Sequence, residues 1–246
     1  MTHLKRHFFL ALFAAGTLIG GAHAATLEGS GKSATETRAL GTFQSISVRD
    51  GIDIVVRQGS SEGVQVRADD NLLPMVQTVV EGSGEARSLR IRFKPGESLR
   101  TRSPVVVTVD VIKLTALASS GSGNISVEAL KTPALALSIS GSSDAKLHQL
   151  DTDQFNISIA GSGDVHASGR ATRLEVSIAG SGEVRTRELA SSDVSVSIAG
   201  SGDASVAAQK SISVSIAGSG DVEYVGAATL AKSRIAGSGT VRQRQP

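Results

Sequence analysis

Five acidic residues recur at regular intervals in the C-terminal half of the chain. Each stands three residues after the first glycine of a Gly-Ser-Gly or Gly-Ser-Ser tripeptide, and they are Asp144, Asp164, Glu183, Asp203 and Asp221. On stacked strands about 4.8 Å apart, neighbouring carboxylates would repel by roughly 1 kcal/mol even in water, and calcium bound between them would relieve that repulsion. Alternatively, short polar residues favour tight turns by hydrogen bonding to local backbone. We favour the turn interpretation, since calcium needs about 6–8 oxygen ligands.

A cluster of basic residues precedes the acidic series. Its members, opposed within the cluster by Glu97 alone, are Arg87, Arg90, Arg92, Lys94, Arg100 and Arg102. Leu89, Ile91 and Phe93 alternate with three of these bases, which we therefore expect on the exposed face of a strand. Such a face can bind an anionic ligand, with envelope polysaccharide or lipid head groups as candidates. The alternative is an ordinary charged strand surface that discourages aggregation, which we prefer.

The serines and histidines do not indicate catalysis. Seven equal Gly-Ser units argue against a single active site, and none has the G-x-S-x-G pattern of a nucleophile elbow. No Lys-Ser or Lys-Thr pair follows the glycines of these seven units, so they are not phosphate-binding loops. His148 and His166 are expected to face solvent on adjacent coils rather than to form a metal site. We therefore expect no enzyme and no cofactor, apart from the calcium considered above.

The tripeptides recur with a period near 20 residues, which is typical of a solenoid. Intervals of 20, 20, 19, 20, 18 and 19 residues separate their first glycines, which are Gly121, Gly141, Gly161, Gly180, Gly200, Gly218 and Gly237. Apolar residues stand two, four and six positions before most of these glycines, with polar residues between them. This period of two predicts strands with one buried face. We predict an all-β, parallel, β-helix-like solenoid of about seven coils, right-handed by strand chirality.

The remaining segments predict a cap, a tail and an open end. Residues 38–116 contain strand-like runs without the period, such as FQSISV and VVVTVDV, and we expect this N-terminal β region to continue the sheets of the solenoid at 117–246. Residues 38–246 would then form one folded unit, and residues 25–37 are predicted to be a flexible tail. The last coil has no polar capping repeat, so either a charged cap or a second copy is expected to cover it. The charged cap would consist of Arg234, Arg242, Gln243, Arg244 and Gln245.

The first 24 residues have the composition of a Sec-type signal peptide. Lys5 and Arg6 precede an apolar run of 12 residues from Phe8 to Ile19, and small residues follow up to Ala24. The run is shorter than the roughly 20 residues that span a bilayer as a helix. We therefore expect export to the periplasm or the cell surface, with no transmembrane segment in the mature chain.

Charge and cysteine content narrow the function further. The chain has 25 Lys and Arg against 23 Asp and Glu, and the predicted signal peptide contains two of the bases and no acid. The mature chain is therefore neutral, which argues against a nucleic-acid partner. There is no cysteine, so an exported fold must be stabilised by packing and backbone pairing rather than by disulfides.

The strand-rich N-terminal region and the phased tripeptides together resemble the bacterial head GIN domain family, also called "putative autotransporter adhesin" and a domain of unknown function. The resemblance rests on FQSISVRDGIDIVVRQGSSEGVQVRADDNLLPMVQTVVEG, on the later LRIRF and VVVTVDVIKLTAL, and on the repeated SGSG(N/D) unit. It covers roughly Leu40 to Val241. It implies an exported β-helix-like domain of the cell envelope, with no catalytic residues to carry over.

Three functional classes remain open. The first is a non-enzymatic envelope module that binds, adheres or supports structure through flat solenoid faces, and that self-associates. The second is a carbohydrate-active β-helix enzyme, and the third is a ladder of carboxylates for divalent cations. Coil lengths of 18 to 20 residues leave no room for the long loops that build a catalytic cleft, so we favour the first class. Its expected partners are envelope polysaccharide, lipid head groups, a protein or a second copy.

Overall fold

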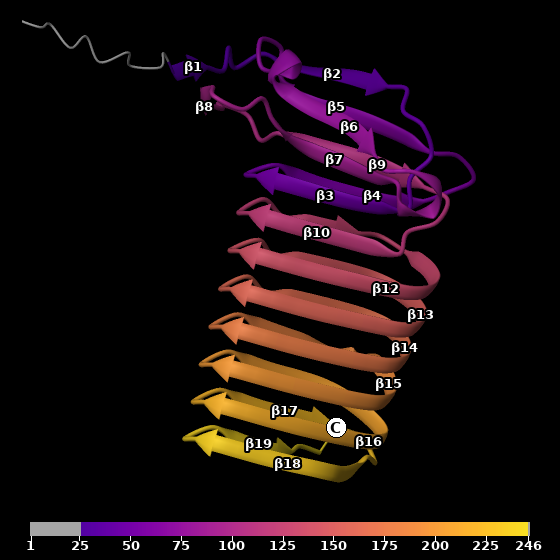
Figure 1. The fold of residues 1–246 in the computed structure, drawn as a ribbon, viewed down its shortest axis with the longest axis vertical. Coiled ribbons are helices and arrows are strands. Elements are labelled where there is room, and N and C mark those ends of the chain that lie inside the picture. Colours follow the sequence, from indigo (N-terminus) through magenta and orange to yellow (C-terminus); the bar gives the residue numbers. More distant parts are fainter. Residues whose placement is uncertain (1–25, 246) are drawn as a thin grey trace, which may run out of the picture.

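The computed structural model of the protein describes residues 26–245, which are dominated by β-strands. The strands stack along one long axis, with β2 and β5 near one end and β18 and β19 at the other (Figure 1). The predicted signal peptide, residues 1–24, lies outside the described residues. Within residues 26–245, no helix is long and apolar enough to cross a membrane.

Nine strands and two single-turn 3-10 helices form the N-terminal part of the described chain. The strands are β1 (Thr26–Glu28), β2 (Ser33–Arg38), β3 (Ser45–Asp50), β4 (Asp53–Gln58), β5 (Gly63–Asp69), β6 (Val76–Glu81), β7 (Ser88–Phe93), β8 (Ser98–Arg100) and β9 (Val106–Val111). The helices are η1 (Leu73–Met75) and η2 (Gly84–Ala86).

The rest of the described chain forms the coils. Their strands are β10 (Ala116–Gly121), β11 (Ile125–Val127), β12 (Leu130–Gly141), β13 (Ala145–Gly161), β14 (Val165–Gly180), β15 (Glu183–Gly200), β16 (Asp203–Gly218), β17 (Asp221–Val225), β18 (Thr229–Gly237) and β19 (Thr240–Gln243).

The corner glycines lie in register from coil to coil. Gly141 pairs with Gly121 and with Gly161, and the same pairing continues to Gly237. Gly180 has a φ of 135°, and a Cβ on it would lie 2.2 Å from the carbonyl oxygen of Gly161, so only glycine fits this corner. The seven corners enclose six turns of a parallel β-solenoid, and their edge is the row of arrowheads in Figure 1. The predicted all-β parallel solenoid is confirmed, with six turns where about seven coils were predicted, and its right-handedness stays a prediction.

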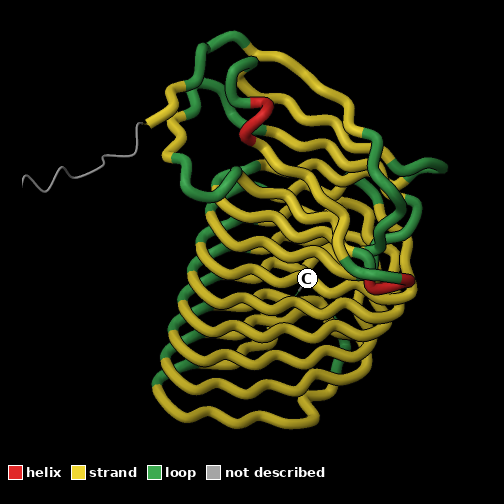
Figure 2. Tube along the Cα trace, turned by 45° about the horizontal axis from the view of Figure 1, so that its top comes forward, coloured by secondary structure: helices red, strands yellow, loops and turns green. Residues whose placement is uncertain are grey.

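Each coil has three faces, because its alternation of buried and exposed residues is interrupted twice. In β13 the exposed pairs 148–149 and 153–154 mark two bends. The long face, 155–161 in this coil, leads to the glycine corner, the second face, 145–147, follows a corner, and the third face, 150–152, lies between the bends. These names apply to the equivalent segments of all coils. Figure 2 shows the corners as a continuous column of loop along one edge of the strands.

Aligned aliphatic side chains fill the interior. Phe155 and Leu174 stand at equivalent positions of successive coils and are fully buried. The isoleucines two positions before the corners are no more than 2% exposed in five successive coils, and they are Ile139, Ile159, Ile178, Ile198 and Ile216. Full burial of one such side chain contributes about 1.5–3 kcal/mol. The alternation read from the sequence therefore accounts for the core.

The N-terminal β region continues the sheets of the solenoid, as predicted. β3 pairs in parallel with β10 and β7, and β4 pairs in parallel with β11 and β9. Beyond these strands the pairing becomes antiparallel, with β5 on β9, β2 on β5 and β6 on β7. Antiparallel strands can be joined by short turns, whereas parallel strands need the chain to run through a full coil before it returns. The regular coils therefore end where the antiparallel pairing begins.

The prediction of a flexible tail at residues 25–37 was wrong. From residue 26 this segment contains β1, which pairs with β8, and most of β2, which pairs with β5. The Asn71 side chain also donates to the carbonyl oxygen of Glu28 at 2.8 Å, and Arg38 at the end of β2 donates to that of Leu73 at 2.9 Å. The segment has few core residues, but its backbone covers the edge of β5, which would otherwise be unpaired.

Candidate functional site

The predicted acidic residues form a column in which each aspartate bonds the backbone of the next coil. Oδ1 of Asp144 accepts a hydrogen bond from the N–H of Asp164 at 3.1 Å, and Oδ1 of Asp164 accepts one from the N–H of Glu183 at 3.0 Å. In the same way, Oδ1 of Asp203 accepts a hydrogen bond from the N–H of Asp221 at 2.8 Å, and Oδ1 of Asp221 accepts one from the N–H of Thr240 at 2.9 Å. Oδ1 of Asp53 accepts one from the N–H of Asn124 at 2.7 Å. We call this series the aspartate ladder. It joins successive coils at the corner edge.

Glu183 departs from the ladder because its side chain is one methylene longer. Its carboxylate pairs instead with the guanidinium of Arg185, which also lies 3.8 Å from an oxygen of Asp164. Across residues 26–245, no three His, Cys, Asp or Glu side chains converge closely enough to hold a metal ion. Calcium binding by the five acidic residues stays the less favoured hypothesis, while the role of the four aspartates as backbone acceptors agrees with the turn interpretation.

The structure pairs three of the six bases of the predicted cluster with acids from distant segments. Arg90 lies 3.0 Å from the Glu81 carboxylate, and Arg100 and Arg102 lie 3.9 Å and 3.3 Å from that of Glu28. Both acids belong to strands that pair with strands of the cluster, β6 with β7 and β1 with β8. Two carboxylates therefore offset part of the positive charge of these three bases.

The remaining bases of the cluster divide between two places. Arg87 donates to the Thr42 hydroxyl at 3.1 Å, away from the others. Arg92 and Lys94 line a hollow of about 340 Å³, together with Arg49 at the end of β3. Arg49 could not be predicted as part of this site, because only the parallel pairing of β3 with β7 brings it there. We call this site the basic hollow.

Apolar and acidic groups complete the basic hollow. Phe93 and Leu99 contribute to its lining, and Glu97 and Asp50 are its acids. The Asp50 carboxylate accepts a hydrogen bond from the N–H of Phe93 at 2.9 Å. Three cations therefore stand against two carboxylates, one of which is already engaged by backbone, so the hollow favours an anionic group.

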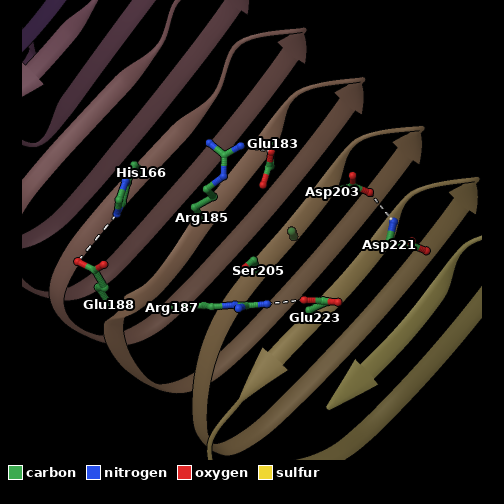
Figure 3. Close-up of a pocket in the computed structure, with 10 residues that line it drawn as sticks. His166, Glu183, Arg185, Arg187, Glu188, Asp203, Ser205, Asp221 and Glu223 are labelled. Atoms are coloured by element: carbon green, nitrogen blue, oxygen red, sulfur yellow. Dashed lines mark hydrogen bonds and ion pairs between the residues drawn. The ribbon is translucent and has the colours of Figure 1, made fainter. Parts of the chain in front are cut away.

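A second hollow of about 460 Å³ lies on the second face of the coils (Figure 3). Ala204 and Ser205 of β16 contribute its small side chains, and charged side chains from β15 and β17 stand around them. At one end the imidazole of His166 lies 4.0 Å from the Glu188 carboxylate. We call this hollow the slot. The sequence indicated His166 as a surface residue and Glu183, Asp203 and Asp221 as corner acids, but it did not indicate Ser205, Arg187 or Glu223.

Two carboxylates in the slot are held in the ionised form. Glu223 accepts hydrogen bonds from Arg244 at 2.6 Å and from Arg187, which reaches across the slot. The bond with Arg244 and the charges of both guanidinium groups lower the pKa of Glu223 below its ordinary value. The pKa of Asp221 is also lowered, by the hydroxyl and then the N–H of Thr240. The slot therefore keeps negative charge at neutral pH.

Comparison with known proteins agrees with this architecture. The family described as "Putative auto-transporter adhesin, head GIN domain" matches residues 42–228. The chain belongs to the head GIN domain family. The matched residues include both the basic hollow and the slot. No curated relative matches the chain.

Solved structures similar to this head GIN domain share its fold along nearly the whole chain. A "putative adhesin" from Bacteroides fragilis is 23% identical with a TM-score of 0.81, and one from Parabacteroides distasonis is 26% identical with a TM-score of 0.71. A "putative lipid binding protein" from Parabacteroides distasonis is 24% identical, also with a TM-score of 0.71. In each case the similarity covers 89% of this chain and 100% of the other.

Proposed function

We propose that the protein is an exported, non-enzymatic binding module of the cell envelope, and that its basic hollow binds anionic groups of envelope polysaccharide. Membership in an adhesin-like family supports the general role. The observation that carries the specific proposal is the convergence of Arg49, Arg92 and Lys94 on one hollow. These cations come from β3, from β7 and from the residue that follows β7, so the solenoid cap positions them.

The hollow suits a carboxylate or phosphate on a polymer better than an isolated ion. Arg49 and Lys94 are exposed, so a chain can pass over them. A guanidinium group presents several donors in one plane, which suits the two oxygens of a carboxylate or phosphate. Phe93 and Leu99 supply apolar surface against which the non-ionic part of a ligand can pack.

The test uses the chain from Ala25 onward and measures binding to polygalacturonate, with dextran as the uncharged control. Binding to polygalacturonate that weakens with salt is expected. The double variant Arg49→Glu/Lys94→Glu should bind at least about tenfold more weakly. Its matched control, Lys32→Glu/Lys113→Glu, makes the same charge change at exposed sites outside the hollow and should bind normally.

Three outcomes would contradict the proposal. Equal binding by the two double variants would show that the hollow is not the site. Binding to phosphatidylglycerol vesicles but not to polygalacturonate would assign the surface to lipid head groups. Shortening of the polysaccharide during incubation would favour the enzymatic alternative. The predicted signal peptide is tested separately, by N-terminal sequencing of the exported protein, which should begin near Ala25.

A further inference from the structure

The slot exists because a small side chain separates two rows of large ones. Ser205 is in register with Arg185 on one neighbouring strand and with Glu223 on the other. Neighbouring strands lie about 4.8 Å apart, so the two flanking side chains rise from backbones roughly 10 Å apart. Arg187 reaches over the intervening coil to pair with Glu223, which closes one end (Figure 3). Asp203 and Asp221 form the other end, at the corner edge.

The lining calls for a polar ligand that forms many hydrogen bonds. Among the described residues, no Phe, Tyr, Trp or large aliphatic side chain lines the slot, whereas small-molecule sites are usually mostly apolar. Carboxylate oxygens can accept from ligand hydroxyl groups, the Ser205 hydroxyl can donate or accept, and the guanidinium groups of Arg185 and Arg187 can donate. The volume, about 460 Å³, lies within the range of small-ligand pockets.

The charges of the slot distinguish its two ends. Arg185 pairs with Glu183, and Arg187 pairs with Glu223, so four of the charges are matched. Asp203 and Asp221 are different: each uses Oδ1 to accept a backbone N–H, and among the described residues neither carboxylate has a Lys or Arg nitrogen within 4.0 Å. The corner end therefore carries two exposed negative charges that form no ion pair within the part of the chain that the structure describes, although the charge of Arg242 acts on Asp221 from a longer distance.

We propose that the slot binds a saccharide that carries a free primary amine, with the protonated amine between Asp203 and Asp221. An ammonium group supplies three donors and one positive charge, which match the second oxygens of these two carboxylates. The sugar hydroxyls bond Ser205 and the ion-paired side chains along the slot. This site is separate from the basic hollow, so the two proposals fail independently.

The test is calorimetric titration with fully deacetylated chitotetraose, and N-acetylated chitotetraose serves as the control ligand. The deacetylated sugar should bind, and acetylation should weaken binding at least about tenfold because it removes the charge and two of the donors. Ser205→Phe should abolish binding by filling the slot. Ser126→Phe is its matched control, because Ser126 also stands five residues after a corner glycine on the second face.

A second pair of variants tests the charge without filling the slot. Asp203→Asn/Asp221→Asn keeps an oxygen for each ladder bond but removes both charges, and should weaken binding at least about tenfold. Asp53→Asn/Asp144→Asn makes the same change at ladder positions outside the slot and should bind normally. The proposal is overturned if wild type does not bind at millimolar sugar or binds both sugars equally. It also fails if Ser205→Phe binds normally, or if a lysine-containing pentapeptide competes better than the sugar.

Discussion

Oδ1 of Asp164 accepts a hydrogen bond from the backbone N–H of Glu183, which stands 19 residues further along the chain and one coil away. The acidic residue at the corner therefore contributes to coil stacking through its own carboxylate. Repulsion along the column is offset at each aspartate by a bond in which the acceptor is charged, and such bonds are stronger than neutral ones. The column is part of the corner structure as well as a charged surface.

Removal of one hydrogen bond of the aspartate ladder should destabilise the fold measurably. Asp164→Ala leaves the N–H of Glu183 without its acceptor, and the free energy of unfolding should fall by about 1 kcal/mol. Asp164→Asn should lose less, because its amide oxygen can still accept. Urea denaturation of both variants, with the exposed Lys146→Ala as control, checks this. An unchanged stability in Asp164→Ala would show that a hydrogen bond from the N–H of Glu183 to water fully replaces the bond to Asp164.

A corner glycine should not tolerate a side chain. Gly180→Ala forces alanine into a φ of 135° with its Cβ 2.2 Å from the Gly161 carbonyl oxygen, so a loss of at least about 3 kcal/mol is expected. Gly59→Ala is the control, since nothing lies within 4 Å of a Cβ there. Thermal unfolding compares them. Similar midpoints in the two variants would mean that the corner can rearrange.

Buried Asp69 should make stability depend on acid pH. The N–H of Arg102, at 2.9 Å, and the backbone and hydroxyl of Ser103 lower the pKa of Asp69 in the folded state. A lowered folded-state pKa means that the stabilisation is complete above the unfolded-state pKa, near 3.8, and is lost as the pH falls through the folded-state pKa.

Measurements of unfolding from neutral pH to pH 3 test this effect. Asp69→Asn should be less stable than wild type at neutral pH, and the difference should shrink only below about pH 4. Glu97→Gln, an exposed change, should follow wild type throughout. A difference between Asp69→Asn and wild type that stays constant down to pH 3 would contradict the assignment.

Calcium should leave the midpoint of thermal unfolding unchanged. Five aspartates of the ladder already use Oδ1 to accept a hydrogen bond from a backbone N–H, and a ligand stabilises a fold only if it binds the native state. Unfolding in millimolar calcium and in chelator checks this. A rise of several degrees with calcium, absent in Asp144→Asn/Asp164→Asn, would instead make the column a cation site.

The sequence alone determined the repeating part of the fold. The corner glycines meet a local requirement for a backbone conformation and a close approach that other residues do not allow. The alternation before them decides which side chains face inward. Burial of both Ile159 and Ile178 requires that their strands stack in register. A shift of the pairing by one residue would move the apolar side chains of a strand to the solvent face. The extension of the sheets by the N-terminal region could also be predicted, because that region contains strand-like runs of the same kind.

Only the tertiary structure decided where the charges act. Glu28 and Glu81, from distant segments, pair with three bases of the cluster, and Arg49 joins Lys94 because β3 lies beside β7. The slot depends on which side chains stand beside Ser205 on strands about 20 residues away in either direction. Charge pairing and hollows depend on positions across strands, and these become definite only when the register of every coil is fixed.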